Sequence, residues 1–259
     1  MKNTAQASSL FSQLLLDAVF PPRCAGAQNG CEIWSRDLFC GSCTQTLQPL
    51  EPPFCTVCGA PFDPMSFDPM SQAADICDKC RDNRPHAAPP FAAVRSLYVF
   101  EGAIRQAVHR LKYDGKTALS APLAALMNEF LRQSSTRFLD NKALTHIVAV
   151  PLHSRRQRQR GYNQSELLAD QLGRLTNVPF SPILLRTRHT TPQIELSIRE
   201  RATNVQGAFA LKQNVNIAGA TILLIDDVYT TGATLRECAR VLKNGGATQV
   251  YGLTLARAI

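Results

Sequence analysis

The stretch ILLIDDVYTTGAT, residues 222–234, restricts the possible folds more than any other part of the sequence. It continues an apolar run, residues 220–226, of the kind that occupies the middle of parallel sheets. Two carboxylates, Asp226 and Asp227, follow, and a Thr/Gly-rich turn then opens a helical pattern. In open α/β sheets, ligands bind beyond the carboxyl ends of the strands. The sequence therefore predicts an α/β fold with a ligand site at these two acids.

Apolar runs and helical patterns alternate through the rest of this half of the chain. Residues 146–152 and 249–256 are expected to form strands, and residues 163–175 a helix whose start offers an Asn or Ser for capping. Residues 234–247 form a second helical pattern, in which Cys238 is expected to be a buried apolar residue. Strand–helix–strand order implies right-handed parallel crossovers. We expect a doubly wound parallel sheet with helices on both faces.

The turn after the two acids has the composition of a phosphate cradle. Backbone N–H groups at a helix start bind phosphate, and a glycine there lets the ligand approach closely. A cradle beside two hydrogen-bond acceptors suits a ligand that carries one phosphate and a vicinal diol, which is ribose 5-phosphate. The candidate phosphate-binding residues are Thr230, Thr231, Gly232, Ala233 and Thr234.

The whole stretch ILLIDDVYTTGAT resembles the 13-residue signature of type I phosphoribosyltransferases. The resemblance implies that Asp226 and Asp227 hold the ribose 2′- and 3′-hydroxyls and that the following loop holds the 5-phosphate. It also implies that the parallel sheet is that of the phosphoribosyltransferases. The ligand it implies is phosphoribosyl pyrophosphate with Mg²⁺.

Eight of the nine cysteines fall between residues 24 and 80, three pairs of them in CxxC spacing. Two such turns point four sulfurs at one ion, which is the geometry of a tetrahedral Zn(Cys)4 site. The fourth pair is wider, with AGAQNG between its thiols. The expected metal ligands are Cys24, Cys31, Cys40, Cys43, Cys55, Cys58, Cys77 and Cys80.

Eight ligands make two zinc sites, and a site closed by four cysteines has no open position for water, so both are expected to be structural. The simplest pairing joins the first four cysteines and the last four, and an interleaved pairing stays open. The competing interpretation, a disulfide framework, fits an oxidising compartment.

Charge divides unevenly along the chain. Residues 1–90 hold six Lys/Arg against nine Asp/Glu, whereas residues 91–259 hold 22 against 11. The second part can therefore attract a pyrophosphate or a nucleic-acid backbone. Four arginines on an expected loop after the strand 146–152 are candidates for pyrophosphate or DNA binding, with a solvated basic stretch as the alternative. They are Arg155, Arg156, Arg158 and Arg160.

A longer basic segment, residues 186–204, has the place of a mobile active-site loop in the resembled fold. Closure of such a loop would exclude water from a reacting sugar. Its arginines are expected either to contact the ligand or to be solvated. They are Arg186, Arg188, Arg199 and Arg201.

A narrower resemblance covers nearly the whole chain. The cysteine pairs, LKYDGK, VPLHSRRQRQRGYNQSELLA, RTRHTTPQIELSIRERATNVQGAF and the terminal GLTLAR resemble the ComF family. That family joins a double zinc ribbon to a phosphoribosyltransferase-like domain and is associated with natural competence, the handling of imported single-stranded DNA. The six-residue gap between Cys24 and Cys31, where two residues are usual, is the one departure and concerns the geometry of that half-site.

The expected organisation follows from these features. Residues 1–20 are expected to form an amphipathic helix, 21–83 the double zinc ribbon, 84–91 a linker and 92–259 the phosphoribosyltransferase-like domain. No apolar run reaches the roughly 18 residues of a membrane helix, and the N-terminal stretch does not read as a signal peptide. We expect a cytoplasmic protein with reduced thiols and no membrane contact.

Three functions fit this sequence. One is a DNA-uptake protein that binds phosphoribosyl pyrophosphate and single-stranded DNA, with Tyr113, Tyr162 and Tyr229 available for base stacking. Another is an active phosphoribosyltransferase, although no acceptor pocket is legible. The third is an assembly factor whose zinc module docks a partner and whose old active site is retained for stability. A protein of the competence machinery is a candidate partner of the zinc module. ATPase activity is excluded, because DGKT lacks the first glycine of a P-loop, Arg110 standing at that position.

Overall fold

The computed structural model describes residues 24–26, 31, 37–63, 76–82, 90–133, 139, 144–188 and 204–259. The predicted helix 1–20 lies outside the described residues, as does most of the predicted linker 84–91. Among the described residues, no helix is both long and apolar enough to cross a membrane.

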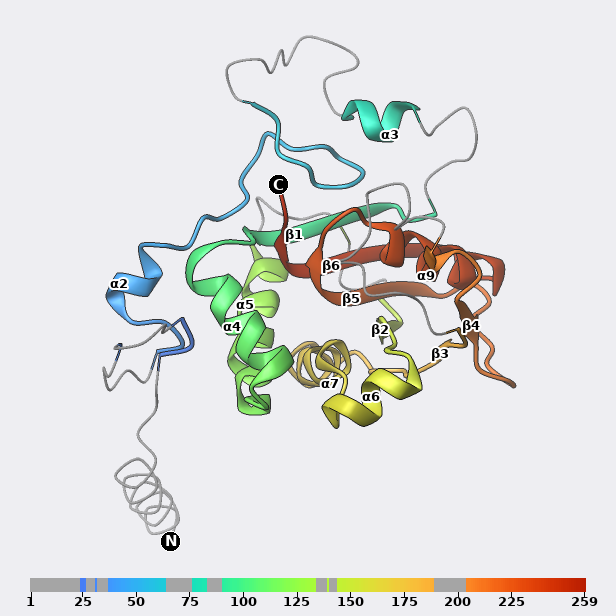
Figure 1. Ribbon diagram of the computed structural model, residues 1–259. Coiled ribbons are helices and arrows are strands. Elements are labelled where there is room, and N and C mark those ends of the chain that lie inside the picture. Colours follow the sequence, from blue (N-terminus) through green and yellow to red (C-terminus); the bar gives the residue numbers. More distant parts are fainter. Residues whose placement is uncertain are drawn as a thin grey trace, which may run out of the picture.

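The centre of the protein is a four-stranded parallel sheet with the order β1-β6-β5-β2 (Figure 1). Its strands are β1 (Ala93–Val99), β6 (Gln249–Arg257), β5 (Thr221–Tyr229) and β2 (His146–Ala149). The two central strands are the ones with the longest apolar runs, as expected of strands that are covered on both faces. The predicted parallel α/β sheet is confirmed.

β5 is longer than the sequence predicts. The strand predicted for residues 220–226 ends at the first acid, whereas β5 continues past both acids to Tyr229, and Asp226 is in register with Thr254 of β6. On the other side β2 ends at Ala149, opposite Ile225. From Asp226 onward β5 therefore extends beyond one of its neighbours, and this leaves the acids at an open edge of the sheet.

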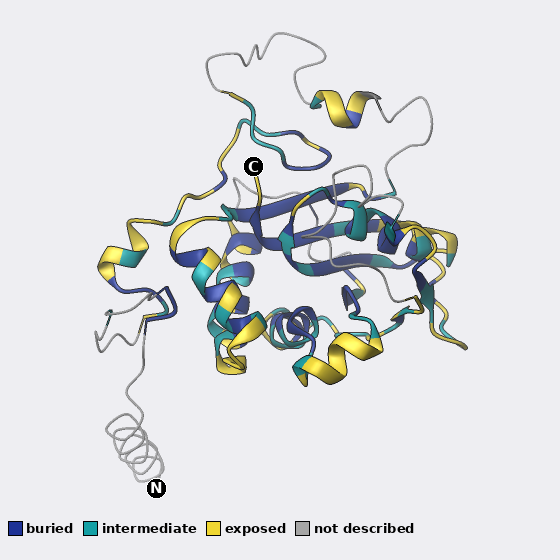
Figure 2. Ribbon diagram, viewed as in Figure 1, coloured by how far each residue is buried: buried dark blue, intermediate teal, exposed yellow. Residues whose placement is uncertain are grey.

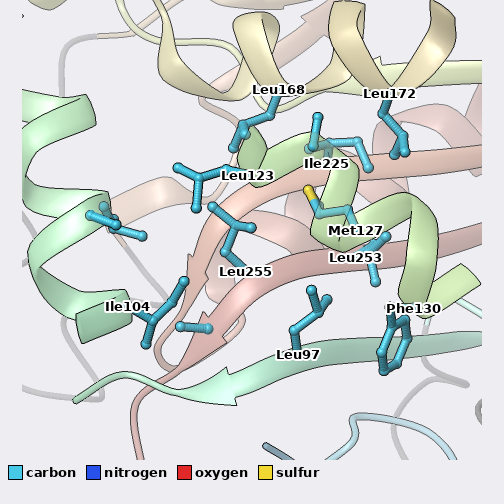
Figure 3. Packing of buried hydrophobic residues seen from close by; sticks show 14 of the residues in the cluster. Leu97, Ile104, Leu123, Met127, Phe130, Leu168, Leu172, Ile225, Leu253 and Leu255 are labelled. Atoms are coloured by element: carbon cyan, nitrogen blue, oxygen red, sulfur yellow. The ribbon is translucent and has the colours of Figure 1, made fainter. Parts of the chain in front are cut away.

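Helices cover both faces of the sheet (Figures 1 and 2). α4 (Gly102–Tyr113), α5 (Ser120–Arg132) and α7 (Gln164–Thr176) pack on one face, and α9 (Ala233–Asn244) packs on the other. Figure 3 shows the hydrophobic core between the sheet and the face covered by α4, α5 and α7. There Leu123 and Met127 of α5 and Leu168 of α7 pack with Leu253 and Leu255 of β6. Each helix contributes its apolar face, as amphipathic helices on a sheet do.

The two helices predicted for the α/β half are found at the predicted places. α7 begins after Asn163, whose side chain accepts a hydrogen bond from the N–H of Ser165 and so caps the helix. α9 ends at Asn244 with Gly245 as its C-cap residue, and Cys238 within it is fully buried, as expected. The remaining elements of this half are the 3-10 turn η1 (Thr117–Leu119), α6 (Ser154–Arg160), β3 (Leu184–Arg186) and β4 (Phe209–Leu211), the last two forming an antiparallel pair.

The cysteine-rich part contributes two short helices, α2 (Gly41–Thr44) and α3 (Asp78–Asp82). α2 lies beside α4, while the chain from residue 46 to 63 runs along β1 (Figure 1). There Leu50 N–H bonds to Leu97 O at 2.9 Å and Val94 N–H bonds to Val57 O at 2.7 Å. These two bonds attach the cysteine-rich part to the edge of the sheet.

Candidate functional site

Asp226 and Asp227 are held by different partners. Asp226 Oδ1 accepts hydrogen bonds from Ser165 Oγ at 3.0 Å and from the N–H of Asp227 at 2.9 Å. Asp227 Oδ1 forms an ion pair with Lys112 Nζ at 2.8 Å. The other oxygen of this buried carboxylate, Oδ2, has no hydrogen-bond partner among the described residues. A buried acceptor without a donor is costly, so this oxygen is suited to receive a donor from a ligand.

The two adjacent acids also alter each other's charge. Burial, and next the negative charge of Asp227, raise the pKa of Asp226 to about 7, against the lowering effect of Lys112, the Asp227 N–H and the Ser165 hydroxyl. Asp226 is therefore a group that changes its protonation near neutral pH. Such a perturbed acid in a cavity is typical of functional sites.

The loop after β5 has the conformation that a phosphate cradle requires. Gly232 is the N-cap residue of α9 and has φ of +75°, in the left-handed region that glycine adopts without strain. The hydroxyl of Thr231 accepts a hydrogen bond from the N–H of Ala233 at 3.4 Å. A small hollow of about 30 Å³ lies here, bordered by Thr230, Gly232 and Thr234 as well as by Asp226. The five predicted phosphate-binding residues thus lie together at the start of α9.

A larger cavity of about 360 Å³ opens over the same acids. Thr230 and Thr234 line one side of it, and Arg156, Arg160 and Arg186 line another. Burial lowers the pKa of Arg186, whose guanidinium lies 5.3 Å from the centre of the Phe209 ring. The cavity therefore joins carboxylates, a phosphate-type loop and guanidinium groups, which is what a sugar ligand with phosphates at two positions requires.

The arginine stretch lies on a helix, and its placement on a loop was wrong. Arg and Gln favour helices, His153 Nδ1 caps α6 by accepting the N–H of Arg155, and Gly161 ends it with φ of +85°. On a helix, residues four apart share a face, so Arg156 and Arg160 face the cavity together. Arg155 and Arg158 are exposed and do not line it.

One wall of the cavity was missed by sequence reasoning. It is the face of α4 that carries Arg105, His109, Lys112 and Tyr113. The rings of His109 and Tyr113 lie 4.7 Å apart, and the Arg160 guanidinium lies 5.1 Å from the Tyr113 ring. Arg105, His109 and Lys112 are spaced four and three residues apart, which places them on one face of a helix, and this spacing can be seen in the sequence.

Other residues singled out from the sequence lie elsewhere. The hydroxyl of Tyr162 donates to Leu111 O at 2.5 Å, and Tyr229 is buried. Neither ring is therefore free for the base stacking that the sequence suggested. Of the three tyrosines named for that role, Tyr113 is the exposed one. Arg188 donates to Gln206 O at 2.7 Å. Arg199 and Arg201 lie outside the described residues.

The eight cysteines gather into two groups of four, Cys24, Cys31, Cys40 and Cys43 in the first cluster, and Cys55, Cys58, Cys77 and Cys80 in the second cluster. The pairing of the first four and the last four is therefore the one found, in spite of the wide gap between Cys24 and Cys31. All eight are free thiols, and no disulfide links them.

Both clusters have the dimensions of a zinc site. Within each, the four sulfurs lie within 4.8 Å of one another. Tetrahedral zinc with Zn–S of 2.3 Å separates its sulfurs by roughly 3.8 Å; Cys31 and Cys40 are 3.6 Å apart, Cys31 and Cys43 3.9 Å, and Cys58 and Cys77 3.6 Å. Burial, together with the negative charges of Cys58 and Cys55, raises the pKa of Cys77 to about 11. Four crowded thiolates need a cation, so the donor set fits Zn²⁺.

Comparison with known families agrees with this architecture. Residues 15–81 match the double zinc ribbon domain, and residues 159–258 match the phosphoribosyl transferase domain. The fold and the site thus define a protein that joins a double zinc ribbon to a phosphoribosyltransferase domain.

Similarity to individual proteins identifies the family more closely. DNA utilization protein YhgH of Salmonella typhimurium is 31% identical over 204 residues, 73% of this chain and 87% of the relative. Competence protein F of Haemophilus influenzae is 29% identical over 238 residues, 91% of this chain and 97% of the relative. Competence protein ComFC of Bacillus subtilis is 30% identical over 223 residues, which cover 84% of this chain and 83% of the relative. The chain belongs to the ComF family.

Two solved structures are similar to parts of this chain. Glutamine phosphoribosylpyrophosphate amidotransferase from B. subtilis has 20% identity and a TM-score of 0.35, covering 52% of this chain and 26% of that one. Purine phosphoribosyltransferase from Pyrococcus horikoshii has 13% identity and a TM-score of 0.33, covering 53% and 80%. At such values the likeness says nothing about substrate.

Proposed function

We propose that this protein binds phosphoribosyl pyrophosphate with Mg²⁺ in the cavity over Asp226 and Asp227, and that it acts in the uptake or use of DNA. The observation that carries the first part is the pair of adjacent acids beside the Gly232 loop, with Asp227 Oδ2 buried and without a hydrogen-bond partner in the part of the chain that the structure describes. A ribose hydroxyl supplies the missing donor. The relatives named competence and DNA utilization proteins support the second part.

Each wall of the cavity has a role in this proposal. Asp226 and Asp227 accept the ribose hydroxyls, and the amides from Thr230 to Thr234 receive the 5-phosphate. Arg156, Arg160 and Arg186 bind the pyrophosphate, because guanidinium groups match phosphate oxygens with two parallel hydrogen bonds. Mg²⁺, when bound, neutralises charge on the pyrophosphate through oxygen ligands.

Titration calorimetry with phosphoribosyl pyrophosphate and Mg²⁺ tests this site. We expect Asp227→Ala to lower the affinity by about a hundredfold, since the loss of a charge-assisted pair of hydrogen bonds costs about 3 kcal/mol. The control is Asp170→Ala on α7, an acid paired with Arg174 at 3.0 Å on the surface. Equal affinity of Asp227→Ala and wild type contradicts the proposal.

The two faces of α6 divide the proposed ligands. Arg156 and Arg160 line the cavity, whereas Arg155 and Arg158 are exposed and available to DNA phosphates. We expect Arg155→Ala with Arg158→Ala to weaken single-stranded DNA binding and to reduce its salt slope by about 1 to 2, since each phosphate contact on a single strand contributes about 0.7. The matched pair Arg156→Ala with Arg160→Ala is expected to weaken phosphoribosyl pyrophosphate binding instead. An unchanged salt slope in the first pair removes the DNA-binding role of α6.

A second candidate function is transfer of ribose 5-phosphate to an acceptor. The α4 wall favours it, because the adjacent His109 and Tyr113 rings, tilted by 48° to each other, border the cavity next to the donor site, and an aromatic ring there can pack against a planar group. Release of pyrophosphate on addition of nitrogen heterocycles tests this function. No release above the hydrolysis rate, at saturating donor, leaves the protein a binding module.

The reduced thiols and the two cysteine clusters complete the proposal. We place the protein in the cytoplasm, where thiols stay reduced. The clusters hold structural Zn²⁺, and the zinc module also offers a surface to a protein of the competence machinery. Metal analysis is expected to find two zinc ions per chain, and fewer than one contradicts the assignment.

A further inference from the structure

The second cysteine cluster rests on two buried arginines of the sheet. Arg257, at the end of β6, donates from Nη1 to Cys58 O at 2.8 Å, and its Nη2 lies 3.9 Å from Cys58 Sγ. Arg95 of β1 donates from Nη1 to Thr56 O at 3.0 Å. Buried guanidinium groups persist only where their charge and donors are matched. The turn that carries Cys55 and Cys58 supplies the matching oxygens and sulfur.

Arg257 also touches the strand that carries the paired acids. Its guanidinium carbon lies 4.3 Å from the centre of the Tyr229 ring, and the two residues are register partners on β6 and β5. Tyr229 is 3% exposed, and its carbonyl accepts the N–H of Ala258 at 2.9 Å. A stacked cation and a strand pairing therefore hold this ring in one place.

The Tyr229 hydroxyl in turn lies directly against the phosphate-type loop. A Cβ added to Gly232 would lie 2.2 Å from the hydroxyl oxygen, far inside van der Waals contact. Gly232 is the residue whose positive φ turns the chain into α9. The Tyr229 ring thus occupies the space next to this turn, and a shift of the ring would let the loop move.

The Cys58 turn links the second cluster to this chain of contacts. An ion bound by the four sulfurs would hold Cys55 and Cys58 in place, and with them the Cys58 carbonyl that accepts from Arg257 Nη1. Without the ion this constraint on the turn is lost. Arg257 would then have a less firmly held acceptor, and its position over Tyr229 would be less fixed.

We infer that Arg257 and Tyr229 are positioning residues that couple metal loading of the second cysteine cluster to the conformation of the loop 230–234. The loop's role as the 5-phosphate site rests on the proposed function; the coupling itself does not. The first cluster has no such contact with the loop among the described residues, so the coupling belongs to the second cluster.

Hydrogen exchange of the peptide spanning residues 228–238 tests the coupling without any ligand. In protein with two zinc ions bound, we expect Arg257→Gln to increase exchange in this peptide about tenfold, the lower end of the effect of losing a supporting contact next to a metal site. Arg95→Gln is the matched control. It removes a buried guanidinium that also bonds to the zinc turn but stacks on Phe54, and we expect a change of less than about twofold.

A second variant keeps the test valid if Arg257→Gln loses zinc. Tyr229→Leu leaves the contact between Arg257 and Cys58 in place, so both ions should stay bound while loop exchange rises. Unchanged loop exchange in Tyr229→Leu, or an equal increase in Arg95→Gln and Arg257→Gln, overturns the inference. Titration of wild type with phosphoribosyl pyrophosphate is run in parallel. If it does not bind while the exchange pattern holds, the proposed function fails and the coupling stands.

Discussion

The two cysteine clusters each consist of four cysteines, but they contact different walls of one cavity. The first cluster packs on α4, where Arg110 Nη1 donates to Cys24 O at 2.7 Å and the N–H of Ala103 bonds to Thr46 Oγ1 at 3.0 Å. The second cluster packs on the sheet through Arg95 and Arg257. α4 carries Lys112, the charge partner of Asp227, whereas the sheet carries the loop after β5.

This difference teaches that a metal site outside the cavity can still act on it through what it contacts. The first cluster contacts α4, the wall that provides the positive charge of the Lys112 ammonium. The second cluster contacts the sheet, the wall that carries the turn at Gly232. We therefore expect damage to the two clusters to have separable effects.

The largest effect is expected from removal of one zinc ligand in each cluster. Cys58→Ser should lower phosphoribosyl pyrophosphate affinity by about a hundredfold, the upper end for losing support next to a metal site, while Cys43→Ser should cost no more than about tenfold. Calorimetry together with zinc analysis measures both. Equal losses in the two variants would mean that the clusters act only by keeping the protein folded.

A smaller effect is expected from adding a methyl group to a glycine that lies against a neighbouring side chain in each region. Gly232→Ala places a Cβ 2.2 Å from the Tyr229 hydroxyl at positive φ, which costs roughly 1–2 kcal/mol in backbone strain alone, or about 5- to 30-fold in affinity. Gly26→Ala places a Cβ 2.7 Å from Ala103 Cβ, at the contact of the first cluster with α4. We expect the first to weaken ligand binding and the second to lower thermal stability with little change in affinity. A loss of affinity in Gly26→Ala with unchanged affinity in Gly232→Ala would contradict the difference between the two clusters.

On the α4 side, Lys112→Met should lower affinity about tenfold, because an anionic ligand loses a cation and the acids lose their neutralising partner. The exposed Lys116 on the same segment is the control. Loop exchange in residues 228–238 should stay unchanged in Lys112→Met. A rise there would show that the two walls are not separable.

The smallest effect concerns pH. Because the pKa of Asp226 is raised to about 7, the folded protein keeps a proton that the unfolded chain releases near pH 4. Stability should therefore fall as pH rises from about 4 to about 7, by about 1–2 kcal/mol for a carboxyl that is only partly buried and so partly screened by solvent. Asp226→Asn should remove this fall in urea titrations, and Lys112→Met should extend it to higher pH. A flat profile in wild type contradicts the raised pKa.

Some features of this protein were predictable because their causes lie close together in the chain. A cysteine pair in CxxC spacing, an apolar strand and a glycine before a helix all act within a few residues. The parallel sheet, α7 with its Asn163 cap, the burial of Cys238 and the signature loop were therefore predicted correctly. The local rule failed for the arginine stretch, where the helix-forming character of SRRQRQR was overlooked.

What the sequence by itself determined is the order of the elements, the eight thiols and the residues 226–234 in a strand–turn–helix. Only the tertiary structure decided that Arg156 and Arg160 face the cavity, that Lys112 pairs with Asp227, and that Arg257 reaches Cys58, 199 positions away in the chain. The physical reason is that such contacts depend on how helices and strands cross in space, and no short-range pattern encodes which side chain will meet which.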